Sequence, residues 1–385
     1  MNKLIFIYYI FITILSFFVG IYFYEKFSFP LPYKNDLLRD SPILAENTVD
    51  LRTLDYYPYT GWHLLSNFNY NGPLIHEKVQ YKETNIRTGD QGFFIDFNLK
   101  FPPVKKKNEF RIILVGGSGA MGMGAQSNEK MFYKLLEKKI NNELNLDKKV
   151  RVINLSMAGS VLFQNFITLN KWAHSLSPDL IICYNGYNDI VIPIINESDS
   201  FLRFNEFNGL TLLLRGSEYP KGYVWLSEYF PKTFNSTGLG QAMKMLFFQN
   251  YFFDLGKKRF KENSNSQNLN TKEIYNDVVI KNTINSLKSI KRDFEGIPIM
   301  FVLQISDEEN ANLYANDLGP DYYNNFFDTI QSNLNNYINK DWIFLNAHKE
   351  FENRKESYFG VHLANEGHEL LAEFLKNELK AFLLN

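Results

Sequence analysis

Four residues that together could carry out acyl transfer are spread along the chain. Ser118 follows the apolar run RIILV, Gly159 ends NLSMAG, Asn188 lies in GYND and His362 lies in VHLANEG. A serine hydroxyl attacks a carbonyl when an imidazole takes its proton, so Ser118 and His362 are the candidate nucleophile and base. The backbone amides of Ser118 and Gly159 and the side-chain amide of Asn188 could stabilise the oxyanion that forms. The residue types therefore predict covalent catalysis on an acyl group.

The chain from residue 110 onward has the element pattern that could bring these residues together. Short apolar runs typical of buried strands occupy residues 111–115, 150–154, 180–184, 299–303 and 342–345. Helical periodicity occupies 129–143, 163–176 and 365–383. Strands that alternate with helices predict a parallel sheet covered on both faces. Ligands bind beyond the carboxyl ends of such strands, so we expect the serine, glycine and asparagine motifs to converge at one edge.

The four motifs, in this order, resemble the blocks of the SGNH, or GDSL-like, hydrolase superfamily. GGSGAMGMG is similar to the nucleophile block, NLSMAG and GYND to the two oxyanion blocks, and VHLANEGHELLA to the histidine block. Upstream, TGDQGFF is similar to a glycine motif that precedes this domain in membrane-anchored bacterial members. The resemblance covers about residues 85–381 apart from an insertion. It implies a flavodoxin-like α/β/α sandwich and a Ser118–His362 mechanism that needs no metal or other cofactor.

Two positions depart from the family pattern. Gly117 stands where the nucleophile block usually has aspartate. Phe359 stands three residues before the histidine, where the family has its acid, and phenylalanine cannot orient an imidazole by hydrogen bonding. Three interpretations stay open: a Ser–His dyad, a replacement acid such as Glu356 or Asp189, or a protein that has lost catalysis.

The resemblance also implies a class of substrate. It indicates a serine esterase that acts on acetyl or other short acyl groups, on a small ester or on an acylated carbohydrate of the cell surface. An O-acyltransferase would use the same acyl-enzyme with a sugar hydroxyl as the acceptor. The alternative from a different class is an inactive component that binds or assembles polysaccharide of the bacterial envelope, and Phe359 is the residue that favours it.

A second glycine motif overlaps the nucleophile block. Gly117, Gly119 and Gly122 spell G-x-G-x-x-G after a strand, which is the pattern of dinucleotide-binding proteins. That pattern also needs an acidic residue near the end of the second strand to bind a ribose. The second strand ends in Val152, Ile153 and Asn154, so we do not expect a nucleotide cofactor.

Composition excludes further classes of function. The formal net charge is -1, so no basic excess suggests a nucleic-acid partner. Cys183 is the only cysteine, which rules out an internal disulfide and a cysteine-rich metal site. The histidines other than His362 have no recognisable ligand spacing, so no metal site is expected, and His368 is expected to be structural.

The N-terminal segment predicts a membrane anchor. Leu4–Tyr24 is an uncharged apolar run that would span roughly 30 Å as a helix. A cleaved signal peptide is the rival interpretation, but the run is longer than usual and no small-x-small cleavage site follows it. Lys3 and the short N-terminal tail favour an N-inside orientation, with the body of the protein outside the cytoplasm.

The sequence divides into three regions. Residues 1–27 form the expected anchor, 28–109 a linker with a small β-rich region, and 110–385 the hydrolase-like domain. Within that domain, residues 190–272 lack the strand–helix pattern and are rich in aromatic residues. This insertion is either a cap next to the site, additional core packing, or a contact with the membrane surface.

Overall fold

The computed structural model describes residues 54–57, 61–64, 66–67, 69–76, 79–94, 100–196, 271–306, 318–319, 321–335, 342–351, 358–359 and 361–384. All of them belong to one compact unit, which comprises Glu46–Asn208 and Leu269–Asn385. The expected membrane span, Glu356 and most of the expected insertion lie outside the described residues. Within the described part, no helix has both the length and the apolarity needed to cross a bilayer.

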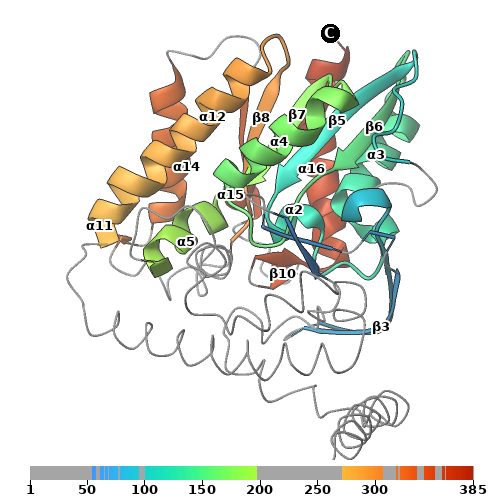
Figure 1. The fold of residues 1–385 in the computed structure, drawn as a ribbon, viewed down its shortest axis with the longest axis horizontal. Helices are drawn as coiled ribbons and strands as arrows, with labels where there is room; N and C mark the ends of the chain where they lie inside the picture. The colour runs from blue at the N-terminus through green and yellow to red at the C-terminus, as the bar shows by residue number, and fades with distance from the viewer. Residues whose placement is uncertain are drawn as a thin grey trace, which may run out of the picture. The chain divides into compact units, whose positions relative to one another are not determined.

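A five-stranded parallel sheet forms the centre of this unit (Figure 1). Its strands are β5 (Glu109–Gly116), β6 (Lys149–Asn154), β7 (Leu180–Asn185), β8 (Ile299–Leu303) and β9 (Trp342–Asn346). Their spatial order is β6-β5-β7-β8-β9, and every neighbouring pair is parallel. This is the flavodoxin-like order, in which the chain reverses direction across the sheet between β5 and β7. The predicted sheet is confirmed, and all five expected strands are present.

Alternating side chains of the strands supply two separate cores. On β5, Ile113 and Val115 belong to one core and Ile112 and Leu114 to the other. This alternation follows from the period-two geometry of a strand. A strand that is buried on both faces has to be apolar throughout, which is why these segments read as uninterrupted apolar runs.

Four helices cover the first face of the sheet: α4 (Leu162–Leu176), α5 (Tyr187–Asn196), α12 (Lys281–Asp293) and α14 (Tyr322–Leu334). Helix α12 continues α11 (Thr271–Ile274) through a π-helical stretch, η5 (Tyr275–Ile280). Figure 1 shows α4 and α12 lying across the front of the sheet. Cys183 on β7 is fully buried in this core. Residues 190–196, where the insertion was expected to begin, complete α5.

Two helices cover the opposite face: α3 (Phe132–Glu143) and α16 (Asn365–Leu384). They pack side by side, and Lys139 of α3 pairs with Glu369 of α16 at 3.0 Å. His368 of α16 is completely buried and its ring stacks on Phe132, with 6.1 Å between ring centroids. The three-layer α/β/α arrangement is therefore confirmed for the described residues.

The described residues before the sheet include short antiparallel hairpins. Strand β1 (Leu54–Tyr57) pairs with β2 (Gly61–Leu64), and β3 (Asn69–His76) pairs with β4 (Val79–Arg87). Short elements complete the described fold: η2 (Asp90–Gly92), α2 (Ser118–Met121), η3 (Asn128–Lys130), α15 (Ala347–Phe351), β10 (Tyr358–Phe359) and β11 (His362–Leu363).

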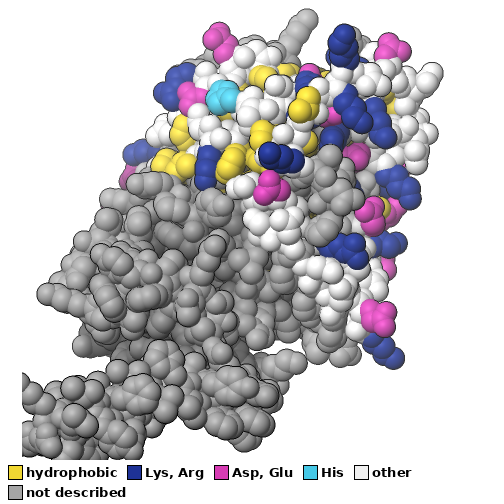
Figure 2. All heavy atoms as spheres, turned by 45° about the vertical axis from the view of Figure 1, so that its right-hand side comes forward, with side chains coloured by type: hydrophobic (Ala, Val, Ile, Leu, Met, Phe, Trp, Pro, Cys, Tyr) yellow, Lys and Arg dark blue, Asp and Glu magenta, His cyan; other side chains and the backbone are white. Residues whose placement is uncertain are grey.

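Charged side chains of both signs are interspersed on one face of the described residues. The face in Figure 2 shows lysine and arginine side chains mixed with carboxylates over the described residues. This mixture agrees with the net charge of -1. Such a face has no large patch of one sign that would attract a polyanion.

Candidate active site

Ser118 lies directly after the central strand of the sheet. Strand β5 ends at Gly116, Gly117 is the N-cap of α2, and Ser118 is the first residue of that short helix. The helix ends after one turn because Gly122 takes a left-handed conformation, with φ of 96°. The serine is half-buried, so its hydroxyl is held at the carboxyl edge of the sheet without being sealed from solvent.

His362 reaches the serine from the far end of the chain. Its Nε2 lies 2.9 Å from Ser118 Oγ, although 244 positions separate the two residues. The histidine is on β11, whose backbone pairs with β10 so that Phe359 lies opposite His362. An imidazole with an unprotonated Nε2 at this distance can accept the serine proton. The structure therefore brings together the predicted nucleophile and base.

The amide of Asn188 lies beside the backbone that carries the nucleophile. Its Nδ2 donates to Ser160 O at 3.0 Å. A Cβ added to Gly117 would come within 2.3 Å of the same nitrogen. A primary amide has two N–H groups, so one of them remains for a ligand when the other is bonded to Ser160. Asn188 is half-buried on α5 and can face a bound oxyanion next to Ser118.

Gly159 belongs to the loop after β6, as predicted. It has φ of 69°, a backbone conformation that glycine adopts more readily than other residues. Two hydrogen bonds connect this loop to the nucleophile strand: Met157 N donates to Gly116 O at 3.1 Å, and Ser160 Oγ lies 2.7 Å from the same oxygen. The loop with the expected backbone donor is thus attached to the strand that precedes Ser118.

Asp189 is one of the two candidate replacement acids, but its carboxylate has other partners. Oδ1 accepts from Leu162 N at 2.6 Å, and Oδ2 accepts from Gly186 N at 3.0 Å and from Asn185 Nδ2 at 3.2 Å. Burial raises the pKa of this carboxyl above its usual value, while these hydrogen bonds act in the opposite direction. The contacts give Asp189 the task of holding loops together rather than orienting His362. Glu356, the other candidate acid, lies outside the described residues.

Gln304 lies next to the candidate site and was not predicted from the sequence. It follows β8 and is 2% exposed, and its Nε2 lies 3.4 Å from Val361 O, the carbonyl before His362. Its own carbonyl accepts from Tyr323 Oη at 2.8 Å. Burial raises the pKa of Tyr323 well above the usual value, so the phenol stays neutral and remains a donor. A polar residue at a strand end was the signal that could have identified Gln304.

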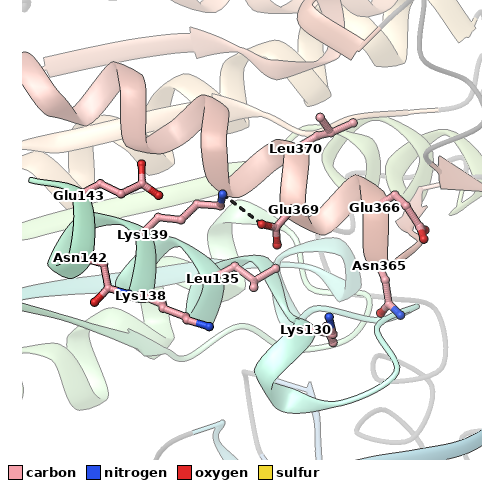
Figure 3. Close-up of a pocket in the computed structure, with 10 residues that line it drawn as sticks. All are labelled: Lys130, Leu135, Lys138, Lys139, Asn142, Glu143, Asn365, Glu366, Glu369 and Leu370. Carbon is pink, nitrogen blue, oxygen red and sulfur yellow. Dashed lines mark ion pairs between the residues drawn. The ribbon is translucent and has the colours of Figure 1, made fainter.

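A groove on the described surface lies elsewhere, between α3 and α16 (Figure 3). Its lining includes Lys139 and Glu369, which form the ion pair drawn there at 3.0 Å. Ser118, Asn188 and His362 are not among the residues that line it. We therefore regard it as the charged seam between two packed helices and not as part of the candidate site.

Comparisons with known proteins found matches only among solved structures. No family model and no curated protein matches the sequence. The lipase/acylhydrolase from Enterococcus faecalis aligns with 12% identity over 71% of this chain and 96% of its own, with a TM-score of 0.41. A GDSL-like lipase from Bacteroides thetaiotaomicron aligns with 12% identity over 72% of this chain and 91% of its own, with a TM-score of 0.39.

An acetylxylan esterase from Geobacillus stearothermophilus aligns with 10% identity over 70% of this chain and 94% of its own, with a TM-score of 0.39. One fold can carry many reactions, so a similarity at this level assigns no activity, which has to be argued from the site. The solved structures similar to this chain include a lipase/acylhydrolase, a second acylhydrolase, a GDSL-like lipase and two acetylxylan esterases.

Proposed function

We propose that this protein is a serine esterase that works through an acyl-enzyme on Ser118. The observation that carries the proposal is the 2.9 Å distance between Ser118 Oγ and His362 Nε2 at the carboxyl edge of the sheet. Both residues are half-buried, so a substrate can reach them. The amide of Asn188 lies beside the same backbone and supplies a donor of the type that ester hydrolysis needs.

The proposed reaction has two stages. His362 takes the proton of Ser118 as its oxygen attacks the ester carbonyl, and the oxyanion is bound by the backbone amides of Ser118 and Gly159 and by the amide of Asn188. The histidine then gives the proton to the leaving alcohol, which leaves Ser118 acylated. Water, activated by the same imidazole, attacks the acyl-enzyme and releases the carboxylic acid.

For the substrate, we propose an acetyl or other short acyl group on a carbohydrate of the bacterial envelope. The support is the motif resemblance together with the apolar N-terminal run Leu4–Tyr24, which we propose anchors the protein in a membrane with its catalytic domain outside the cytoplasm. A sugar hydroxyl that replaced water as the acceptor would make the same site an O-acyltransferase. Analysis of the products formed with and without a sugar acceptor distinguishes these two reactions.

The first test is hydrolysis of p-nitrophenyl acetate by the full-length protein. We expect wild-type turnover to fall by roughly 10³-fold or more in Ser118→Ala and in His362→Ala. Ser156→Ala is a matched control, because its buried hydroxyl lies in the loop after β6 and has no hydrogen-bond partner among the described residues. Its turnover should equal that of the wild type.

A serine-directed phosphonate provides an independent readout. It should label the wild type on Ser118 and leave Ser118→Ala unlabelled. Full activity in Ser118→Ala would refute the mechanism. A folded wild-type protein that neither turns over the ester nor reacts with the phosphonate would instead favour the inactive, polysaccharide-binding alternative.

A further inference from the structure

A network of buried polar side chains connects the loops that carry the candidate oxyanion donors. Its members are Ser160, Asn165, Asn185 and Asp189, and none is more than 7% exposed. Ser160 follows β6, Asn165 is on α4, Asn185 ends β7 and Asp189 is on α5. Buried polar groups are stable only when they are hydrogen-bonded, and each of these four side chains contacts the next.

The Asp189 carboxylate forms one end of this network. Oδ1 accepts from Leu162 N at 2.6 Å, which holds the first residue of α4. Oδ2 accepts from Gly186 N at 3.0 Å and from Asn185 Nδ2 at 3.2 Å, which holds the turn between β7 and α5. A single carboxylate therefore connects the loop after β6 with the loop after β7.

The other end of the network reaches the candidate oxyanion donor, the side-chain amide of Asn188. Asn185 Oδ1 accepts from Asn165 Nδ2 at 3.0 Å, and Asn165 Oδ1 lies 2.9 Å from Ser160 Oγ. The same hydroxyl lies 2.7 Å from Gly116 O and 3.1 Å from Met157 O, and its one proton can be donated to only one of these three oxygens at a time. Ser160 O in turn accepts from Asn188 Nδ2 at 3.0 Å. The network of contacts thus begins at the Asp189 carboxylate and ends at the amide of Asn188, the preceding residue in the sequence.

We propose that Ser160, Asn165, Asn185 and Asp189 are positioning residues that fix the amide of Asn188 as an oxyanion donor. This inference rests on the proposed esterase function. Asn188 Nδ2 has two N–H groups; Ser160 O binds one and sets the direction of the other. Donors stabilise a transition state only when they are aimed before the reaction begins, and an error of about 1 Å in position can lower the rate about 10²-fold.

The competing explanation is that the four residues only stabilise the fold. In that case their replacement would lower stability, and any loss of activity would add to the loss caused by removing Asn188. The positioning role predicts the opposite result. Once the donor amide is absent, its supports have nothing left to position, so their removal should have little further effect.

A double-mutant cycle in the full-length protein tests this with p-nitrophenyl acetate. We expect Asn188→Ala to lower kcat by roughly 10² to 10³-fold, because it removes an oxyanion donor. Asp189→Asn should lower kcat by at least about tenfold and change KM by less than about threefold, because a carboxamide cannot accept from the donors on both sides. The double variant should differ from Asn188→Ala by less than about twofold.

Thr168→Val is the matched control for the loss of a buried polar contact. Thr168 Oγ1 donates to Gln164 O at 3.0 Å within α4 and is not part of the hydrogen-bond network described above. Its replacement should leave kcat unchanged. If Asp189→Asn does not fold, Ser160→Ala takes its place in the same cycle, because it removes the contacts of the hydroxyl with Gly116 O, Met157 O and Asn165 while leaving Ser160 O.

The outcomes separate this inference from the function on which it rests. If Ser118→Ala abolishes turnover but the losses in Asp189→Asn and Asn188→Ala multiply, the positioning role is overturned and the esterase stands. If Asp189→Asn has the wild-type kcat, the positioning role is likewise overturned. If Ser118→Ala retains full activity, the esterase mechanism fails and the positioning role fails with it.

Discussion

At the scale of single residues, Gly117 shows how one missing side chain shapes the site. An ideal Cβ at this position would lie 2.3 Å from Asn188 Nδ2 and 3.4 Å from Ser160 O. The backbone of Gly117 has φ of -82°, which any residue can adopt, so no backbone strain requires the glycine. The glycine instead leaves room for the side-chain amide of Asn188, which a Cβ at this position would overlap.

Gly117→Ala should therefore separate activity from stability. The methyl group displaces the end of a flexible side chain, so we expect the free energy of unfolding to change by less than about 1 kcal/mol. We expect kcat for p-nitrophenyl acetate to fall by roughly 10² to 10³-fold, because a displaced amide no longer binds the oxyanion. Urea unfolding and steady-state kinetics measure the two quantities. Asn188→Ala is the comparison, and a Gly117→Ala variant with wild-type kcat would contradict the assignment.

The sequence predicts some of these residues and not others for a physical reason. Ser118 and His362 were predictable because each lies in a motif beside a strand or helix, and the parallel sheet brings strand ends together. Asp189 was left open as a replacement acid, and its hydrogen bonds with Leu162, Gly186 and Asn185 could not be read from its motif. Ser160 and Asn165 were not identified at all, because their function depends on contacts among three elements that are separated in sequence.

At the scale of elements, the β3–β4 hairpin is attached to the segments that follow both the nucleophile and the base. Tyr81 Oη accepts from Asn365 N at 3.2 Å, at the start of α16. Asn365 Oδ1 accepts from Gln126 N at 3.0 Å, in the loop that leads from α2. Gln126 also donates through Nε2 to Glu83 O at 3.0 Å, on β4. Asn365 thus links three separate segments three residues after His362.

Replacing this asparagine should loosen the site and weaken the fold. We expect Asn365→Ala to lower the free energy of unfolding by about 1–2 kcal/mol, because Gln126 N loses its acceptor in a half-buried place. Asn365→Asp keeps that acceptor, and its charge is favourable at the start of a helix, so its stability should stay close to the wild-type value. Urea unfolding of the three proteins makes the comparison. Equal losses in both variants would show that the acceptor oxygen is not the important group.

The elements themselves were unequally predictable. The five core strands could be located because burial on both faces requires continuous apolar runs such as IMFVL at 299–303. Helices α12 and α14 were not predicted, since their apolar residues alternate with asparagine and serine, which compete with helix formation through side-chain hydrogen bonds. Residues 190–196 of helix α5 were assigned to the insertion, because the segment that starts at residue 190 lacks the strand–helix pattern of the rest of the domain.

At the scale of the whole molecule, one buried histidine connects folding with pH. His368 is 0% exposed, and burial lowers its pKa to about 3, while the adjacent backbone of Met123 and Gly122 acts weakly in the other direction. The ring is therefore neutral in the folded protein. In the unfolded chain, a histidine takes up a proton near pH 6.5. Between these two values the unfolded state binds the additional proton, so acid favours unfolding.

The contribution of this residue can be measured by its removal. Between pH 7.5 and pH 5, His368 should lower the free energy of unfolding by about 2 kcal/mol, and His368→Phe should lose that part of the pH dependence. Urea unfolding at several pH values provides the measurement. Phe132→Leu is the control, because it removes the stacked ring and keeps the histidine, so it should lower stability at every pH with an unchanged slope. The same slope in His368→Phe as in the wild type would refute the assignment.

The position of Cys183 allows the rate at which the central sheet opens to be measured. Its sulfur is the only thiol of the chain, is fully buried on β7, and has its pKa raised by burial. Thiol reagents react with a thiolate that they can reach. Cys183 becomes accessible only when β7 separates from the helices that cover the sheet. With no second thiol to compete, the rate of alkylation reports the lifetime of the closed core. The strand that leads to Asn188 thus contains a natural probe of kinetic stability.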